Sequence, residues 1–280
     1  MSSDRTRGEA GTTDDGFDAL MRKVGRERGV VCASYKQKCM RRRVGLRLRA
    51  RGVDSFVDYA DLLDRDAAEF DRLVGSLTIS VTRFFRDAPV WSAIARDVVP
   101  ALWDSDRPDL RVWSAGCASG EEAYSIAMLF HRHAAVAGML AQIERLSILG
   151  TDVDTSGLSA ADRAEYAEKD LNETPAPLRE RYFTSEPPFI PAPGVRRLVR
   201  FARHDLLGPD YPPAIQDVII CRNVLIYFDR PSQERVLEQF SRSLVPGGYL
   251  ILGKVETLLG ASRGRFVPVA QRERIFRKVS

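Results

Sequence analysis

Residues 114–125 read Ser-Ala-Gly-Cys-Ala-Ser-Gly-Glu-Glu-Ala-Tyr-Ser. The apolar run before them, 110–113, is typical of a strand, and apolar side chains spaced three and four residues apart over 123–130 predict a helix after them. A strand, a glycine turn and a helix form the nucleotide-binding half of an open α/β sheet. Glycine lets the backbone approach a ligand closely, and the first turn of a helix has unbonded N–H groups. The stretch therefore predicts a nucleotide-type site at the start of a helix.

The glycine spacing argues against a dinucleotide. Gly116 and Gly120 are spaced G-x-x-x-G, whereas the dinucleotide fingerprint is G-x-G-x-x-G. Glu121 and Glu122 follow directly, and these carboxylates suit the helix dipole but would repel a phosphate. The pattern favours a nucleoside that carries positive charge, and S-adenosylmethionine fits. The alternative is a purely structural turn followed by ordinary acidic residues of a first helical turn.

Composition indicates a cytoplasmic globular protein. The chain has 280 residues, 44% hydrophobic and 29% charged, with a net charge of +4. Its four cysteines show neither C-x-x-C pairs nor zinc spacing, and its three histidines do not form a metal pattern. No apolar run approaches a membrane-spanning length, and residues 1–7 lack the apolar segment of a signal peptide. We expect a monomer that binds no metal and does not insert into a membrane.

The chain changes character near residue 87. Residues 1–15 are small and polar and are predicted to be a disordered tail, and 16–87 carry helical apolar stripes without strand alternation. A connecting helix and loop are expected at 88–108, and 109–280 show the βαβ rhythm of a parallel sheet, with strands at 110–115, 147–152, 217–221 and 248–253. The proline-rich segment 183–203 predicts a small inserted β-subdomain.

Polar side chains follow two further strands. Asp152 ends the second strand, where a carboxylate commonly accepts hydrogen bonds from ribose hydroxyls. The alternative role is capping the next helix, which Asp154 or Thr155 could equally serve. Arg222 and its neighbours follow the fourth strand, at the edge where open α/β sheets bind ligands.

Two basic features lie outside the predicted sheet. Arg86 follows Phe84 and Phe85, which we expect to pack between the domains, and its guanidinium could orient a carboxylate. Residues 36–51 contain eight basic residues and no acidic one, which is either a solvated helix face or a docking surface for an acidic partner. Clustered arginine also raises nucleic acid as a candidate partner.

Five segments occur in an order that is highly specific: 82–87 (Thr-Arg-Phe-Phe-Arg-Asp), 113–125, 151–154, 181–183 and 221–228 (Cys-Arg-Asn-Val-Leu-Ile-Tyr-Phe). Together they resemble the chemotaxis protein methyltransferases, the CheR family. The resemblance implies a class I S-adenosylmethionine-dependent, Rossmann-like α/β domain with a small β-subdomain, preceded by an all-helical domain. It further implies methylation of glutamate side chains on the cytoplasmic helices of chemoreceptors.

The resemblance also assigns residues. Arg86 and Tyr227 would lie nearest the reacting methyl, and the basic helix, with Arg41, Arg42, Arg43, Arg47 and Arg49, would dock the receptor. Asp205 and the turn 253–256 (Gly-Lys-Val-Glu) depart from the usual asparagine and Gly-His-Ser-Glu. The cofactor pocket would be lined, in addition to Gly116 of the glycine turn, by Ser80, Thr82, Arg86, Glu122, Asp152, Asp205, Leu206, Arg222 and Asn223.

Two rival functions remain open from the sequence. A nucleic-acid methyltransferase would use the 36–51 basic surface, although Asn223 is followed by Val-Leu-Ile and not by the Pro-Pro-Tyr frequent in amino-methylating enzymes. A non-catalytic adaptor would bind the cofactor as a signal, which the presence of Arg86, Glu122 and Tyr227 disfavours.

Overall fold

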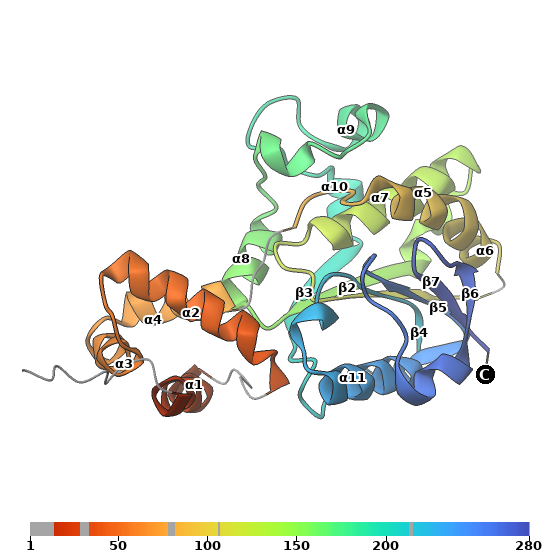
Figure 1. Cartoon of the computed structure of the whole chain (residues 1–280). Helices are drawn as coiled ribbons and strands as arrows, with labels where there is room; N and C mark the ends of the chain where they lie inside the picture. Colours follow the sequence, from red (N-terminus) through yellow and green to blue (C-terminus); the bar gives the residue numbers. More distant parts are fainter. Residues whose placement is uncertain (1–13, 29–33, 78–81, 106, 213–214, 280) are drawn as a thin grey trace, which may run out of the picture. The chain divides into compact units, whose positions relative to one another are not determined.

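The chain divides into two units, which we describe separately. A computed structural model describes residues 14–28, 34–77, 82–105, 107–212 and 215–279, traced in Figure 1. The first unit ends at Ile79 and the second begins at Ser80, so the boundary precedes the predicted one at 87. Residues 1–13 of the predicted disordered tail lie outside the described residues, and a helix already begins at Asp14.

The first unit is helical throughout its described part, as predicted. Its apolar side chains recur every three to four residues and close a core of their own around Phe17, Leu20, Val44 and Tyr59. A buried polar cluster accompanies this core, because Glu69 accepts hydrogen bonds from the Tyr59 hydroxyl and from Arg47. The helices are α1 (Asp14–Arg28), α2 (Gln37–Arg51), α3 (Phe56–Arg65) and α4 (Ala67–Leu77).

The second unit is built on a seven-stranded sheet with the order β3-β2-β1-β4-β5-β7-β6. The first five strands in this order are mutually parallel, and β7 is antiparallel to both of its neighbours. The four sequence-predicted strands are confirmed, and three of them begin one to four residues earlier than predicted. The strands are β1 (Leu110–Ala115), β2 (Leu146–Asp152), β3 (Val199–Arg203), β4 (Gln216–Cys221), β5 (Leu244–Leu252), β6 (Phe266–Ala270) and β7 (Ile275–Lys278).

Helices cover both faces of the sheet (Figure 1). On one face, α7 (Glu121–Val136) packs with a continuous helical run formed by α5 (Ala88–Ala93), a π turn η2 (Ile94–Val98) and α6 (Val99–Trp103). The predicted linker helix is therefore part of the core of the second unit. On the other face, Phe240 of α11 (Arg230–Ser243) meets the Trp113 ring edge-on. Short turns of 3-10 helix occur at η3 (Leu140–Arg145), η5 (Leu225–Tyr227) and η6 (Gly260–Arg265).

The segment between α8 (Thr155–Arg163) and β3 corrects a prediction. It contains η4 (Glu168–Leu171), α9 (Ala176–Tyr182) and α10 (Pro193–Arg196). Its extended parts form only isolated bridges, Tyr166 to Phe189 and Phe183 to Pro191, so no β-subdomain sheet forms among the described residues. Residues 199–203, expected in the insert, are instead the edge strand of the main sheet. Four prolines over 187–193 leave too few N–H donors for a ladder.

Candidate cofactor and methyl-transfer site

The carboxyl ends of β1, β2 and β4 bring the predicted site segments to one edge of the sheet. The loop after β1 is tied to β2, because the N–H groups of Gly116 and Cys117 both donate to the Thr151 carbonyl, at 2.8 and 2.9 Å. Burial raises the pKa of the Cys117 thiol well above its usual range. Cys117 is therefore held as a neutral thiol inside the loop and is not a nucleophile.

Both loop glycines are required by their backbone conformation and by their neighbours. Gly116 has φ +82°, and a Cβ there would lie 2.5 Å from a methyl group of Val224. Gly120 has φ +92°, and its Cβ would lie 2.8 Å from both Ala161 and the Phe201 ring. The loop thus packs tightly on its protein side, which fixes the path of its backbone.

Asp152 and Asp154 divide the two roles that the sequence left open. Asp154 caps α8, where its Oδ1 accepts the N–H of Ser156 at 2.9 Å. The Asp152 carboxylate accepts the N–H of Ala118 and that of Asp154, both at 2.9 Å, so it connects the glycine loop to the end of β2. Burial raises the pKa of Asp152, and these backbone donors oppose the rise. A partly exposed carboxylate is thereby fixed at the predicted ribose position.

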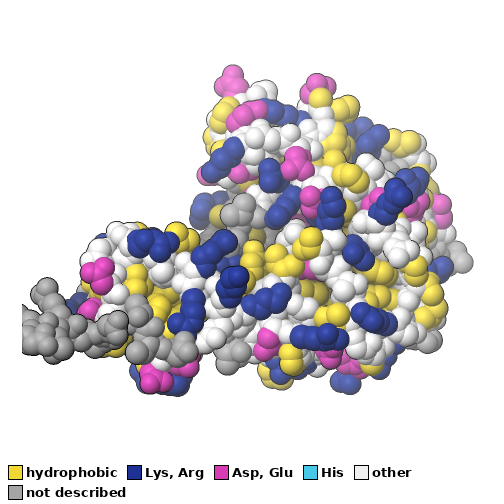
Figure 2. Space-filling view, in the orientation of Figure 1, with side chains coloured by type: hydrophobic (Ala, Val, Ile, Leu, Met, Phe, Trp, Pro, Cys, Tyr) yellow, Lys and Arg dark blue, Asp and Glu magenta, His cyan; other side chains and the backbone are white. Residues whose placement is uncertain are grey.

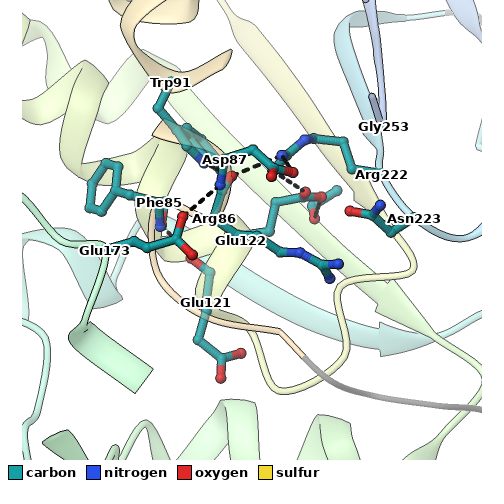
Figure 3. A network of polar contacts seen from close by, with 12 residues as sticks. Phe85, Arg86, Asp87, Trp91, Glu121, Glu122, Glu173, Arg222, Asn223 and Gly253 are labelled. Atoms are coloured by element: carbon teal, nitrogen blue, oxygen red, sulfur yellow. Dashed lines mark hydrogen bonds and ion pairs between the residues drawn. The ribbon is translucent and has the colours of Figure 1, made fainter. Parts of the chain in front are cut away.

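Glu122 and Arg222 form the charged centre of the site (Figure 3). The Glu122 carboxylate accepts the Ser114 hydroxyl at 2.8 Å and lies 3.6 Å from an Arg222 nitrogen. Arg222 also donates to the Asp87 carboxylate and to the Arg86 carbonyl, both at 2.8 Å. Burial raises the pKa of Glu122, whereas the charge of Arg222, the Ser114 hydrogen bond and the charge of Arg86 lower it.

The segment that carries Arg86 is held in an unusual backbone conformation. Phe85 and Asp87, on either side of Arg86, have φ values of +53° and +63°. The Phe85 N–H donates to the Ser125 hydroxyl at 3.1 Å. The Asp87 N–H donates to Glu173 at 2.8 Å (Figure 3). Such strain persists only where surrounding contacts impose it, and it frequently marks functional sites.

The phenylalanine pair before Arg86 corrects another prediction. Phe84 meets Tyr166 and Phe183 edge-on, and Phe85 meets Trp91. All of these aromatic rings belong to the core of the second unit. Phe84 and Phe85 therefore anchor the Arg86 segment within the core of the second unit.

The remaining predicted pocket residues lie at the sheet edge or next to it. Asp205, just after β3, accepts the Leu207 N–H at 2.9 Å, and Leu206 is buried. Thr82 is half-buried at the start of the described part of the second unit, and Ser80 lies outside the described residues.

One site residue escaped the sequence analysis. Glu256, in the turn after β5, is only 4% exposed and accepts backbone N–H groups from the loop that contains Asn223. Tyr227 lies in η5, the short helical turn of the same loop. The sequence analysis treated the Gly-Lys-Val-Glu stretch only as a departure from a motif. The available signal was the retained glutamate three residues after Gly253.

The family is decided by two matches that together cover most of the chain. Residues 80–275 match the CheR methyltransferase SAM-binding domain, and residues 15–78 match the CheR methyltransferase all-alpha domain. The chain belongs to the CheR methyltransferase family. A Listeria monocytogenes chemotaxis protein methyltransferase is 35% identical over 239 residues, which cover 85% of this chain and 88% of that protein. Chemotaxis protein methyltransferase 2 of Pseudomonas aeruginosa is 34% identical over 256 residues, 89% of each chain.

This CheR protein uses S-adenosylmethionine (SAM), and its residues fit that cofactor. The loop glycines admit no side chain on their protein-facing side, and two fixed carboxylates, Glu122 and Asp152, suit the ammonium group and the ribose hydroxyls. Among the described residues, Arg222 Nε is buried and has no hydrogen-bond partner. It therefore matches the carboxylate of the methionine part. When bound, SAM supplies an electrophilic methyl group on a sulfonium.

The predicted docking arginines of this CheR protein separate into two faces of α2. Arg42 and Arg49 are exposed, and Arg41 lies over the Phe17 ring, 4.2 Å from its centroid. Arg43 is 5% exposed and donates to the Leu77 carbonyl, and Arg47 binds the buried Glu69 carboxylate with two nitrogens, at 2.6 and 2.9 Å. Arg43 and Arg47 are thus structural residues, which corrects their prediction as docking residues.

Two further findings concern metals and membranes. No group of three or more potential metal-ligating side chains gathers within the part of the CheR chain that the structure describes. In the same part, none of the helices combines the length and apolar character needed to cross a bilayer.

Proposed function

We propose that this CheR protein transfers the methyl group of SAM to glutamate side chains on the cytoplasmic helices of chemoreceptors. The products would be glutamyl methyl esters, which serve chemotactic adaptation. The observation that carries the proposal is the arrangement of Arg86 beside the Glu122–Arg222 pair (Figure 3). It sets a guanidinium, which binds carboxylates well, next to the predicted seat of a cationic methyl donor.

The reaction needs no general base. A glutamate side chain has an ordinary pKa of about 4.3, so its carboxylate is ionised and nucleophilic at neutral pH. A carboxylate oxygen attacks the methyl carbon in line with the sulfur, the new O–C bond forms as the C–S bond breaks, and the bonding pair returns to sulfur. Opposite charges are neutralised and no proton moves. The protein's task is alignment, which can lower a barrier by about 7–11 kcal/mol in favourable cases.

The site residues take distinct roles in this proposal. Glu122 binds the ammonium group of the cofactor and Asp152 binds the ribose. Arg86 and Tyr227 orient the reacting groups. The rest of the pocket is formed by Gly116, Thr82, Asp205, Leu206, Arg222 and Asn223, with Ser80 assigned by family resemblance alone.

The outer face of α2 is proposed to dock the receptor. Arg42 and Arg49 are seven residues apart, and Leu46 between them is 53% exposed, so one face presents two cations and an apolar side chain. Acidic receptor helices complement this face. We expect the double variant R42E/R49E to raise the KM for a receptor fragment at least tenfold and to leave the affinity for S-adenosylhomocysteine (SAH) unchanged.

The matched control is R65E, because Arg65 is also an exposed helix residue of the first unit but lies on α3. The R65E variant should keep its receptor KM within twofold of the wild type. Equal KM values for all three proteins would remove the docking role of α2.

One labelling experiment tests the reaction itself. Tritiated SAM is incubated with the protein and either chemoreceptor cytoplasmic fragments or nucleic acid. Base-labile label in the receptor fragment supports the ester. Label in nucleic acid would replace the proposal with a nucleic-acid methyltransferase, and tight SAM binding without label in either substrate would replace it with a non-catalytic adaptor.

A further inference from the structure

A single buried carboxylate collects the backbone of the loop that follows β4. Glu256 accepts the N–H of Gly253 at 2.6 Å, that of Asn223 at 3.1 Å and that of Ile226 at 3.3 Å. Within the described residues it makes no ion pair, and the donors that face it are backbone N–H groups. Hydrogen bonds to an ionised acceptor are about twice as strong as neutral ones, and three of them hold one loop against one turn.

The turn that carries Glu256 fits closely against the same loop. A Cβ at Gly253 would lie 2.7 Å from the Asn223 nitrogen and 2.7 Å from a Glu256 oxygen, so backbone packs on backbone there. The far side of the turn is held as well, because Arg274 Nε donates to the Lys254 carbonyl at 3.3 Å. Lys254 and Val255 themselves are exposed. The inward residues of the turn are therefore fixed, while its outward pair points to solvent.

The loop needs such support. Asn223 has φ +62°, a conformation that a residue with a side chain keeps only when its neighbours impose it. Three residues later Ile226 lies in η5, so the hydrogen bonds of Glu256 fix both the start of the loop and the turn that carries Tyr227. Asn223 and Tyr227 cannot shift independently of this carboxylate.

We infer that Glu256 is a positioning residue for methyl transfer, which sets Asn223 against the cofactor and Tyr227 against the reacting methyl without contacting either group itself. This inference rests on the proposed function, because the roles of Asn223 and Tyr227 are assigned there. It adds a residue outside the predicted pocket, and it states how that residue acts.

The test compares E256Q with E256D and with a matched control. A glutamine keeps the shape but has one acceptor oxygen, and its NH₂ group faces N–H donors. We expect E256Q to weaken SAH binding in calorimetry at least tenfold and to slow single-turnover methyl transfer at least tenfold. E256D keeps the charge and should recover part of both losses. E234Q makes the same change at the part-exposed Glu234 of α11 and should stay within twofold of the wild type.

A local readout separates positioning from general stability. Amide hydrogen exchange in E256Q should accelerate over residues 222–228 and stay unchanged in α7. E256Q with wild-type SAH affinity and transfer rate would overturn the inference. If E256Q does not fold, hydrogen exchange in the wild-type chain tests the inference. The amides of Asn223 and Ile226 should exchange slowly, and rapid exchange at both would overturn the inference.

Failure of the proposed function looks different. A wild-type protein that binds SAH but esterifies no receptor fragment contradicts the proposed substrate. In that case the SAH affinity and the amide hydrogen exchange of E256Q still test the positioning role of Glu256. A wild-type protein that esterifies the receptor while E256Q does so equally well contradicts only the inference about Glu256.

Discussion

Replacing Gly116 by alanine should destabilise the catalytic unit through contact with one residue, Val224. The new Cβ would lie 2.5 Å from one Val224 methyl and 3.3 Å from the other, at a backbone φ of +82°. The side chain of valine is short and branched, so it cannot swing away as a lysine could. The substitution therefore combines backbone strain with overpacking.

These two contributions set the magnitude. A left-handed conformation costs an L-residue about 1–2 kcal/mol, and overpacking costs about 1–3 kcal/mol. G116A should therefore lower the free energy of unfolding by about 2–5 kcal/mol. V224A removes both methyl groups that collide. In a chain that already carries V224A, G116A should cost only the backbone strain. The double variant should therefore lose about 1–3 kcal/mol less stability than the sum of the two single variants.

Urea unfolding followed by tryptophan fluorescence measures these values. All three tryptophans, Trp91, Trp103 and Trp113, lie in the second unit, so the signal reports on that unit alone. Gly264 supplies the control: its φ is ordinary and a Cβ there would meet nothing within 4 Å, so G264A should change stability by less than about 1 kcal/mol. Additive effects of G116A and V224A, within about 0.5 kcal/mol, would refute the steric argument.

Three further predictions concern the site. D152A should weaken SAH binding at least tenfold, because it removes the carboxylate that fixes Ala118 and that is proposed to bind the ribose, and unchanged affinity in calorimetry would reject that role. Y227F should slow single-turnover transfer more than it weakens SAH binding, and equal rates would contradict an orienting hydroxyl. Burial raises the pKa of Glu121 to about 7 from 4.5, so the folded state keeps a proton that the unfolded state loses between these values. The contribution of protonated Glu121 to stability is complete below pH 4.5 and is lost as pH rises through 7, which lowers the free energy of unfolding by about 3 kcal/mol. E121Q should lack this component, and parallel stability curves for E121Q and wild type from pH 5 to 8 would contradict it.

The central strands and the glycine loop were predictable because their physics is local. β1 and β4 are buried along almost their whole length, so they appear in the sequence as continuous apolar runs. The loop after β1 combines glycines with a helix start, and Asp152 follows a strand end directly. In each case the signal lies within a few residues.

The errors arose where distant residues decide. The insert was predicted as a β-subdomain, but one of its two isolated bridges joins Phe189 to Tyr166, which precedes the insert in the sequence. Phe84 was expected between domains because its actual partner, Phe183, lies 99 residues away in the chain. Glu256 was missed for the same reason, since it binds a loop 30 residues before it.

The two faces of α2 have a consequence for how this protein can change its target. Arg47 makes two hydrogen bonds to the buried Glu69, so its replacement removes the closest cation from a carboxylate in the interior. Arg42 and Arg49 can be replaced without exposing a buried charge, because both side chains are exposed. Figure 2 shows basic side chains spread over the visible surface. Only those without a structural role can be replaced without a loss of stability. Under the proposed docking role, recognition of a new receptor would therefore evolve by single substitutions along one stripe of this helix without passing through unstable intermediates.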